Sequence, residues 1–595
     1  MQECGFVDEI SNEMPLGDEI VVCDENCDDE FLISNSRKLK AQVYAPEINF
    51  YLKNSKDDAL SKAKAVSALY QARLIGFDES KQSEHEKAVG RNVLIISDDD
   101  KSALKELLEQ NTFKVISLLK SEVLAIYGDV GDLAVVIKQN SEEYELECDF
   151  ALINNASFDM LVQSGSFEIN SLSDDEILAF LRANTPKYAY KTRFFYDESI
   201  CQYHQRRNEI CGACANTCPS VAILKNDEQK ELVFSQIDCL GCALCVSVCP
   251  SGSLSLASMP KSAFSQIAKL YKDNIILAIN ESLLDYEPKT IPDTRPFWQE
   301  NEQISPFKQA SVYSLAKRPK KLDLSNLSLP SDVLPLALNT KMLDHASYLT
   351  LAQSSGAQIV VYQPNISAIN LSNIKLVNEI YQKLYGKDAV LVATNENELV
   401  NKLKQACKIE GSQLIKDDYD MPKREIFATR LAAVLDGRDL GVVQGDEILR
   451  YADVVINEDA CTLCSSCVAA CNVNALIADT SDNSIKFNAS LCTACGYCVA
   501  SCAEEGAIDI KRGALKLNPS FFSYQSLAHD ELFKCQECGK EFATKKSIEK
   551  IAKIMAVHFA NDPIKLKSLY CCAECKAKLM LKAQIDANRA GGFYE

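Results

Sequence analysis

Residues 461–502 read CTLCSSCVAACNVNALIADTSDNSIKFNASLCTACGYCVASC, and this stretch decides the fold. Its eight cysteines fall into two runs with the same spacing, Cys-x2-Cys-x2-Cys-x3-Cys. Thiolates are soft ligands, and a tight loop with this spacing can turn several of them toward one metal centre. The runs are Cys461, Cys464, Cys467 and Cys471, and Cys492, Cys495, Cys498 and Cys502.

The same array occurs once more, 253 residues earlier in the chain, so the sequence contains an internal repeat. One position differs, because Asn208 stands where the later copy has Cys461. The seven cysteines that the earlier copy shares with the later one are Cys211, Cys214, Cys218, Cys239, Cys242, Cys245 and Cys249.

Each copy resembles the bacterial-type two-cluster ferredoxins, in which such runs bind [4Fe-4S] clusters. The resemblance implies two ferredoxin-like dicluster modules, at residues 196–262 and 456–514. In that family the last cysteine of one run completes the cluster of the other run. The resemblance therefore implies three complete ligand sets, which are Cys218 with Cys239, Cys242 and Cys245; Cys471 with Cys492, Cys495 and Cys498; and Cys502 with Cys461, Cys464 and Cys467.

The fourth set, Cys211, Cys214 and Cys249, lacks one ligand. A lone cysteine, Cys201, lies seven residues before the vacant position, and a long loop between ligands costs little closure entropy. Three interpretations remain open: Cys201 completes the set, the site holds a three-iron cluster, or an unusual ligand comes from His204 or Asn208. We favour Cys201, which gives four [4Fe-4S] clusters in all.

The C-terminal region contains a second kind of cysteine pattern. Cys535 and Cys538 form one Cys-x2-Cys pair, Cys572 and Cys575 form another, and 33 residues separate the pairs. Two such pairs are typical of a closed, structural zinc site. The sequence therefore predicts one zinc ion in a small zinc-ribbon-like region, with a fifth iron-sulfur cluster or unmetallated thiols as alternatives. The neighbouring Cys571 leaves the choice of ligand open.

Charge and hydropathy exclude some classes of partner. The net charge of −20 gives no attraction to nucleic acid or to anionic lipid. From Lys511 onward, however, fifteen Lys and Arg outnumber nine Asp and Glu, which favours an acidic partner for this region. No apolar run reaches the roughly 18 to 20 residues that cross a bilayer, so we expect no membrane insertion.

The compartment follows from the first residues and from the cysteines. Eleven acidic residues precede the first basic residue, Arg37, and a signal peptide has the opposite pattern. We therefore expect a cytoplasmic protein. In a reducing compartment the 26 cysteines favour metal binding over disulfides.

The fold class expected for the whole chain is α+β and α/β multidomain, with the two modules separated by α/β domains. No GxGxxG or P-loop fingerprint of a nucleotide or flavin site occurs. Residues 334–362, LPLALNTKMLDHASYLTLAQSSGAQIVVY, resemble the small flavodoxin-like domain of hydrogenase delta-type iron-sulfur subunits, although none of that domain's cluster cysteines match. The remaining regions are an acidic N-terminal segment (1–88) with a helix over Asp58–Leu74, a small α/β domain (89–195), an α/β spacer (263–455) and the basic C-terminal region (515–595).

Other cysteines and one histidine are expected to be structural. Cys148 and Cys407 lie alone in apolar or helical surroundings and are predicted to be buried thiols. His345 is predicted to be a core or surface residue rather than a ligand. The remaining thiols, Cys4, Cys23 and Cys27, are either incidental or part of a metal site that lacks one ligand.

The sequence predicts many redox centres but contains no recognisable motif of a substrate pocket. It therefore predicts an electron-transfer protein rather than a self-contained enzyme, with no catalytic residue of its own. The layout looks like that of the large 4Fe-4S proteins found alongside bacterial molybdenum- or tungsten-dependent formate dehydrogenases. That resemblance implies a redox partner such as a formate dehydrogenase. The alternatives are an assembly or maturation scaffold for such an enzyme, and a subunit of a larger oxidoreductase.

Overall fold

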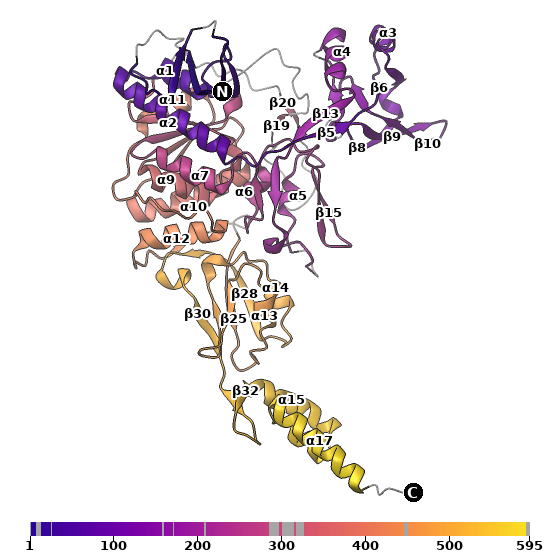
Figure 1. Cartoon of the computed structure of the whole chain (residues 1–595), viewed down its shortest axis with the longest axis vertical. Helices are drawn as coiled ribbons and strands as arrows, with labels where there is room; N and C mark the ends of the chain where they lie inside the picture. The colour runs from indigo at the N-terminus through magenta and orange to yellow at the C-terminus, as the bar shows by residue number, and fades with distance from the viewer. Residues whose placement is uncertain are drawn as a thin grey trace. The chain divides into compact units, whose positions relative to one another are not determined.

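The computed structural model describes residues 2–7, 14–24, 27–157, 160–170, 172–206, 210–284, 297–299, 314–316, 327–444 and 450–590. The chain divides into two compact units, Met1–Arg430 and Leu431–Glu595, and each contains one of the two cysteine arrays (Figure 1). Among the described helices, none combines the length and the apolar character needed to cross a bilayer.

The N-terminal segment folds around a parallel sheet that the sequence did not predict. The predicted helix is confirmed as α2 (Ala59–Asp78), which begins where the Asp58 side chain accepts the Ser61 N–H. The Tyr70 hydroxyl donates to the Gly5 carbonyl at 2.7 Å and so ties α2 to the sheet. The sheet has the order β2-β1-β3-β4, and its elements are β1 (Gln2–Val7), β2 (Ile20–Cys23), β3 (Glu30–Ser34) and β4 (Lys40–Tyr44), followed by α1 (Pro46–Asn54).

Residues 84–191 contain a parallel sheet between two covering layers. The strand β6 is buried on both faces, because Val93 and Ile95 pack against helices while Leu94 and Ile96 pack against an antiparallel sheet. The parallel sheet has the order β12-β11-β6-β7, with β6 (Asn92–Ile96), β7 (Lys114–Leu118), β11 (Phe150–Ile153) and β12 (Ser166–Glu168). The covering elements are the helices α3 (Ser102–Gln110) and α4 (Asp174–Ala183) and the strands β8 (Val123–Asp129), β9 (Asp132–Gln139) and β10 (Glu142–Cys148). At the two ends of this part of the chain, β5 (Glu84–Ala88) pairs in antiparallel fashion with β13 (Lys187–Lys191).

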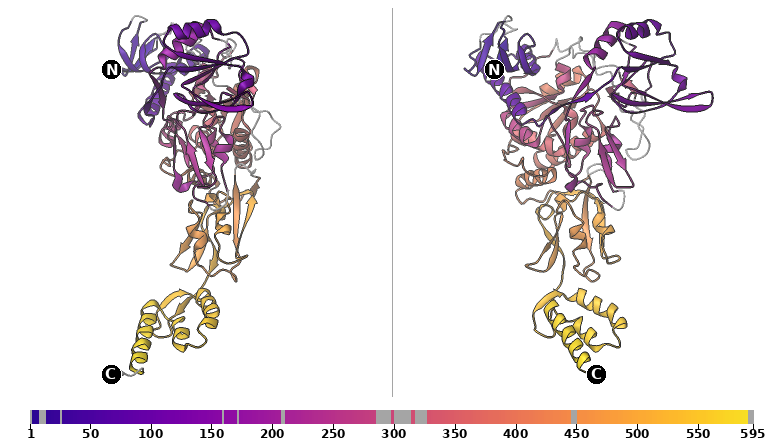
Figure 2. Two further views of the ribbon diagram at one scale, coloured as in Figure 1. Left: turned by 90° about the vertical axis from the view of Figure 1, so that its right-hand side faces the viewer. Right: turned by 45° about the vertical axis from the view of Figure 1, so that its right-hand side comes forward.

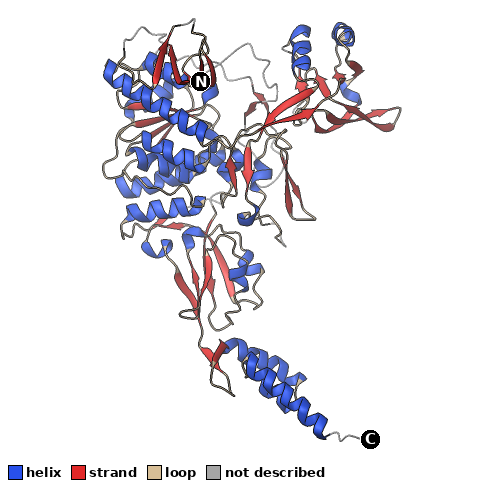
Figure 3. Cartoon of the chain, in the orientation of Figure 1, coloured by secondary structure: helices blue, strands red, loops and turns tan. Residues whose placement is uncertain are grey.

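Residues 261–435 form a second parallel sheet flanked by helices (Figure 3). In chain order the sheet runs second, first, third and fourth strand, which is the order of flavodoxin-like sheets. The strands are β18 (Ile275–Ile279), β21 (Val333–Ala337), β22 (Ile359–Tyr362) and β23 (Val390–Ala393). The helices are α7 (Lys261–Leu270), α8 (Glu281–Leu284), α9 (His345–Ser355), α10 (Ala368–Tyr385), α11 (Glu396–Gln405) and α12 (Lys423–Leu435). A separate strand pair consists of β19 (Phe297–Gln299) and β20 (Ser314–Ala316).

The two cysteine arrays fold on one plan, an outer antiparallel strand pair around an inner hairpin, with two short helices that each begin between the second and third cysteine positions of a run. The first array uses β14 (Phe194–Tyr196) with β17 (Leu254–Leu256), β15 (Ile223–Asn226) with β16 (Glu231–Phe234), α5 (Ala213–Thr217) and α6 (Leu244–Val248). The second uses β25 (Tyr451–Ile456) with β28 (Ile508–Gly513), β26 (Leu476–Asp479) with β27 (Ser484–Phe487), α13 (Ser466–Ala469) and α14 (Tyr497–Ala500). The second array adds β30 (Gln525–His529), and β24 (Val442–Val443) pairs with β29 (Leu515–Lys516).

The C-terminal region consists of one hairpin and a group of helices that pack beside it (Figure 2). The hairpin pairs β31 (Leu532–Lys534) with β32 (Glu541–Thr544). The helices are α15 (Lys545–His558), α16 (Pro563–Ser568) and α17 (Ala573–Ala590). The region predicted to be zinc-ribbon-like is therefore built mainly from helices, with two cysteine pairs where the hairpin meets α17.

Candidate functional site

In the first array the eight cysteines meet in two groups of four. The first group lines one cavity, whose walls also include Tyr196 and Leu254. Burial raises the pKa of Cys214 well above its usual value, and the charges of the other three thiols raise it further. The members of this group are Cys201, Cys211, Cys214 and Cys249.

The second group of the first array lies beside the first group. Burial raises the pKa of Cys245 well above its usual value, and the charges of its three companions and of Cys214 raise it further. The members of this group are Cys218, Cys239, Cys242 and Cys245.

The second array is arranged in the same way. Burial raises the pKa of Cys467 to about 11, and the charges of Cys461, Cys502 and Cys464 also raise it. Burial likewise raises the pKa of Cys498, with further contributions from the charges of Cys492, Cys495 and Cys471. The structure thus brings together the same cysteines that the resemblance to ferredoxins grouped.

Backbone N–H groups point at the first cysteine of several runs. The N–H two residues after the cysteine donates to its Sγ at 3.4 Å in three places, from Tyr203 to Cys201, from Gly241 to Cys239 and from Ala494 to Cys492. Such hydrogen bonds stabilise thiolates and tune the potential of a metal centre that the thiolates hold.

The residue after the second cysteine position of every run has a left-handed backbone, so that successive N–H groups turn toward the thiols. Two of these residues are glycines, which adopt such a φ without steric cost. The other two, Ala243 and Ser465, adopt it despite a Cβ, which indicates that the loops require this turn. The four φ values are 124° at Gly212, 64° at Ala243, 61° at Ser465 and 77° at Gly496.

Cys201 occupies the position in the first array that Cys461 occupies in the second. An Asp or Asn side chain accepts the N–H two residues later and forms a turn, and a cysteine follows four residues after the Asp or Asn. These turn residues are Asp197 before Cys201, Asn457 before Cys461 and Asn488 before Cys492.

The strands confirm this equivalence, because β14 ends directly before Asp197 and β25 ends directly before Asn457. The constant offset between the arrays therefore breaks between Cys201 and Cys211, where the first array contains seven extra residues. The Asp-x3-Cys and Asn-x3-Cys pattern was the signal in the sequence that could have identified this alignment.

The two other candidates for the fourth ligand, His204 and Asn208, are not found beside the other three cysteines in the described structure as Cys201 is. His204 is not among the residues that line the cavity, and its Nε2 lies 3.6 Å from Glu198 Oε2. Asn208 lies outside the described residues.

The α/β region after the first array contacts the cysteine loops of that array. The buried Lys423 Nζ donates to the carbonyl oxygens of Ser247 and Cys249 at 3.1 and 2.9 Å. Asn339 donates to the carbonyl of Gly241 at 2.9 Å. These contacts fix the backbone on which the thiols of both groups depend.

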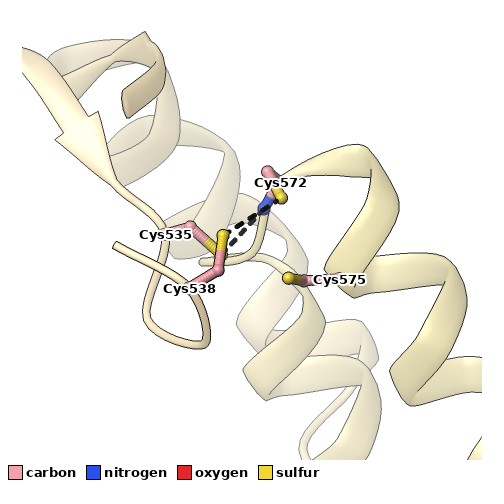
Figure 4. A group of neighbouring side chains, drawn as sticks. All are labelled: Cys535, Cys538, Cys572 and Cys575. Carbon is pink, nitrogen blue, oxygen red and sulfur yellow. Dashed lines mark hydrogen bonds between the residues drawn. The ribbon is translucent and has the colours of Figure 1, made fainter. Parts of the chain in front are cut away.

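The C-terminal cysteines form a compact group of four (Figure 4). Their sulfur atoms all lie within 4.8 Å of one another, and the N–H of Cys572 donates to Cys535 Sγ at 3.3 Å. Two thiolates bound at about 2.3 Å to one tetrahedral ion are about 3.8 Å apart. Cys538 Sγ and Cys572 Sγ are 3.7 Å apart, so the group fits a single tetrahedral ion.

Cys571 is not a member of this group of four. Its Sγ donates to the carbonyl of Lys567 at 3.4 Å, and the fourth member of the group is Cys575, one turn into α17. The structure therefore selects Cys572 over its neighbour.

The remaining thiols lie in the folded parts of unit Met1–Arg430. The prediction of a buried thiol is confirmed for Cys148, which belongs to an apolar core, but is wrong for Cys407, which is half-buried. Lys387 Nζ approaches Cys407 Sγ at 3.3 Å, which keeps this thiol near the surface. Cys23 and Cys27 pack at the edge of the N-terminal core.

His345 is a core residue, as predicted. It is 2% exposed, its Nδ1 lies 2.8 Å from Asn373 Oδ1, and its ring meets Phe427 edge to face. Burial lowers the pKa of His345 to about 3, and the charge of Lys423 acts in the same direction. The imidazole is therefore neutral at pH 7.

Both cysteine arrays match models of known protein families. Residues 209–253 match a family model described as a 4Fe-4S dicluster domain, and residues 453–503 match a second model with the same description. No curated protein is significantly similar to the chain in sequence. The chain thus contains two 4Fe-4S dicluster domains of the ferredoxin kind, one in each of its compact units.

Proposed function

We propose that this protein is an electron carrier that holds four [4Fe-4S] clusters and passes single electrons to a partner oxidoreductase. The observation that carries the proposal is the meeting of sixteen cysteines in four groups of four, within two dicluster domains. A carrier needs several redox centres and no substrate pocket, and the chain meets the first requirement in both units.

Each group of four supplies the ligands of one cluster. The proposed sets are Cys201, Cys211, Cys214 and Cys249; Cys218, Cys239, Cys242 and Cys245; Cys461, Cys464, Cys467 and Cys502; and Cys471, Cys492, Cys495 and Cys498. The chemistry of four soft thiolates in a buried loop fits an iron-sulfur cube. Cys201 is included because it has the turn, the N–H hydrogen bond and the cavity position of a first ligand.

The chain's own residues would tune what these clusters do. A bound cluster exchanges one electron with a partner and keeps its ligands. The backbone N–H groups of Tyr203, Gly241 and Ala494 share the negative charge of the thiolates, which favours the reduced form. Fifteen of the sixteen thiols are buried or half-buried, which limits the access of water to the clusters.

The C-terminal group would hold one structural zinc ion through Cys535, Cys538, Cys572 and Cys575. All four positions are filled by protein ligands, which is typical of a structural rather than a catalytic site. The ion would hold the hairpin β31-β32 against the start of α17.

The partner is proposed to be a cytoplasmic oxidoreductase, with a formate dehydrogenase as the first candidate because of the layout of the chain. A net charge of −20 favours association with a basic face, at rates that fall as salt is added. A second function, an assembly scaffold, is favoured by exposed apolar side chains on the helices of the C-terminal region, which are Ile551, Ile554, Val557, Leu581 and Ile585.

Metal analysis of anaerobically purified full-length protein tests the proposal. Four cubes and one zinc ion predict about sixteen iron atoms and about one zinc atom per chain. The reduced protein should show paramagnetic signals and should reduce a formate dehydrogenase or another acceptor faster than a Cys492→Ala variant does. A scaffold would bind its client equally well after this substitution, and an iron-free protein would contradict both functions.

A further inference from the structure

The C-terminal region contacts the loop of one particular cysteine group, and this contact brings positive charge to it. Thr544 is the residue directly before α15, and its hydroxyl donates to the Thr462 carbonyl at 3.0 Å. The Ser547 hydroxyl donates to the same carbonyl at 2.6 Å. Thr462 lies between Cys461 and Cys464, so the start of α15 sits on the ligand loop itself.

Two lysines of α15 extend this contact. Lys546 Nζ donates to the Glu458 carbonyl at 2.7 Å, three residues before Cys461. Lys550 Nζ forms an ion pair with Glu504 Oε2, two residues after Cys502. The other oxygen of this carboxylate accepts the Thr462 hydroxyl at 3.0 Å, so Glu504 links both parts of the ligand set.

The charges of both lysines act on the thiols of this group. Lys546 Nζ is held at the carbonyl three residues before Cys461, and Lys550 Nζ is held at the carboxylate two residues after Cys502, so an ammonium group lies beside each part of the ligand set. A positive charge that stabilises a thiolate also stabilises the added negative charge of a reduced cluster.

This group is also the more exposed of the two in the second domain. Its ligand Cys464 is exposed, whereas the neighbouring group consists of buried and half-buried thiols in the described structure. An electron that leaves the domain would therefore have its shortest path to a partner from Cys464.

We propose, on the basis of the electron-carrier function above, that Lys546 and Lys550 raise the reduction potential of the cluster held by Cys461, Cys464, Cys467 and Cys502, and that this cluster delivers the electron to the partner. With both clusters bound, one electron would pass from the reduced cluster held by Cys471, Cys492, Cys495 and Cys498 to the oxidised cluster beside α15. The first is oxidised, the second is reduced, and no bond is formed or broken. Both lysines are tuning residues, since neither is a ligand.

Redox titration of the anaerobic full-length protein, followed by paramagnetic resonance, tests the proposal. The signals are assigned with the Cys492→Ala variant, which lacks the neighbouring cluster. In Lys550→Gln and in Lys546→Gln we expect the reduced-to-oxidised ratio of the α15 cluster to fall about tenfold at a fixed potential, which is about 59 mV for one electron.

Substitution of Glu504 separates charge from structure. Glu504→Gln removes a negative charge and should raise the potential that Lys550→Gln lowers, and the double variant should return near the original value. If Lys550→Gln and Glu504→Gln shift the potential in the same direction, or do not shift it, the proposal is wrong.

Two further substitutions, one of a lysine and one of an arginine, show whether the effect is specific to Lys546 and Lys550. Lys553→Gln changes an exposed residue further along α15 and should leave all potentials unchanged. Arg512 donates to the carbonyl of Ala494 in the neighbouring loop, so Arg512→Gln should lower the potential of the neighbouring cluster instead. Loss of all cluster signals in the unsubstituted protein would contradict the proposed function itself, whereas signals that ignore the lysines would contradict only this inference.

Discussion

Lys423 Nζ lies 2.9 Å from Asp344 Oδ2, and both side chains are only 7% exposed. The same ammonium donates to the carbonyl oxygens of Ser247 and Cys249, so one buried cation joins the start of α9 to the first dicluster domain. Burial alone would raise the pKa of Asp344, but the charge of Lys423 and the hydrogen bonds from Lys423 and from the Ser347 N–H act against burial, and the pKa is lowered overall. The Asp344 carboxylate is therefore charged.

Removing the cation should destabilise the first unit and loosen a cluster loop. Lys423→Met leaves Asp344 as an unpaired buried charge, which costs about 3 to 5 kcal/mol. We expect a lower unfolding temperature for the first unit and faster loss of iron from the domain that contains Cys249, measured by calorimetry and by iron release in air. Lys375→Met, at an exposed lysine, is the control, and equal behaviour of the two variants would refute this role.

Acid should destabilise the first unit through His345. Its pKa is about 3 in the folded protein and about 6.5 in the unfolded chain. Between these values the unfolded chain binds a proton that the folded protein does not bind, so stability falls as the pH decreases from about 6.5 toward 3. Each pH unit in this window costs up to about 1.4 kcal/mol.

The His345→Gln variant measures that contribution. Its urea unfolding midpoint at pH 7 and pH 5 should differ less than that of the unsubstituted protein. Carboxylates that titrate in the same range affect both proteins, so the comparison isolates the imidazole. An equal acid dependence in both proteins would show that His345 does not contribute.

Loss of the Cys201 thiol should remove one cluster. In Cys201→Ala we expect about four fewer iron atoms per chain, or a three-iron signal in place of one cube, because the first group loses its fourth thiolate. The other three clusters should remain. Cys407→Ala, which removes a half-buried thiol outside the groups, should keep the full iron content. An unchanged iron content in Cys201→Ala would mean that another ligand completes the site.

Loss of a C-terminal thiol should remove zinc and leave iron unchanged. Cys538→Ala should bind less than a tenth of the zinc of the unsubstituted protein, because a closed site with three ligands binds the ion much more weakly. The matched control is Cys571→Ala, whose thiol points to the Lys567 carbonyl instead. Replacement of the ion by Co²⁺ should give a tetrahedral thiolate absorption spectrum in the control only, and iron at this site would contradict the prediction of zinc.

The cysteine spacing predicted the most local part of the structure and missed parts that depend on distant contacts. Apart from Cys201, the thiols of one run lie within ten residues of one another, so their positions follow from one loop. The helix at Asp58 was also predictable, since its capping turn and its apolar positions are local. The flavodoxin-like strand order agrees with the resemblance seen at residues 334–362.

The N-terminal sheet was missed because its strands are short and acidic segments separate the first three of them. Its stability depends on contacts from elsewhere, such as the hydrogen bond from Tyr70 to Gly5. Similarly, no local pattern reveals that Lys550 reaches Glu504, since the two residues are 46 positions apart in the chain. The cysteine spacing alone leaves three candidates for the fourth ligand, because counting back from Cys211 leads to Asn208, and only the turn at Asp197 distinguishes Cys201.

The turn before Cys201 has a consequence for the search for redox proteins in genomes. The proposed ligand Cys201 is positioned by the end of β14 and by the turn at Asp197, so the chain can lengthen after Cys201 without displacing this thiol. A search that requires fixed intervals between cysteines starts too late, as the matched segment here starts at residue 209. Where the loop between the first two cysteines is this long, such a search would leave the first of the proposed ligands outside the matched segment.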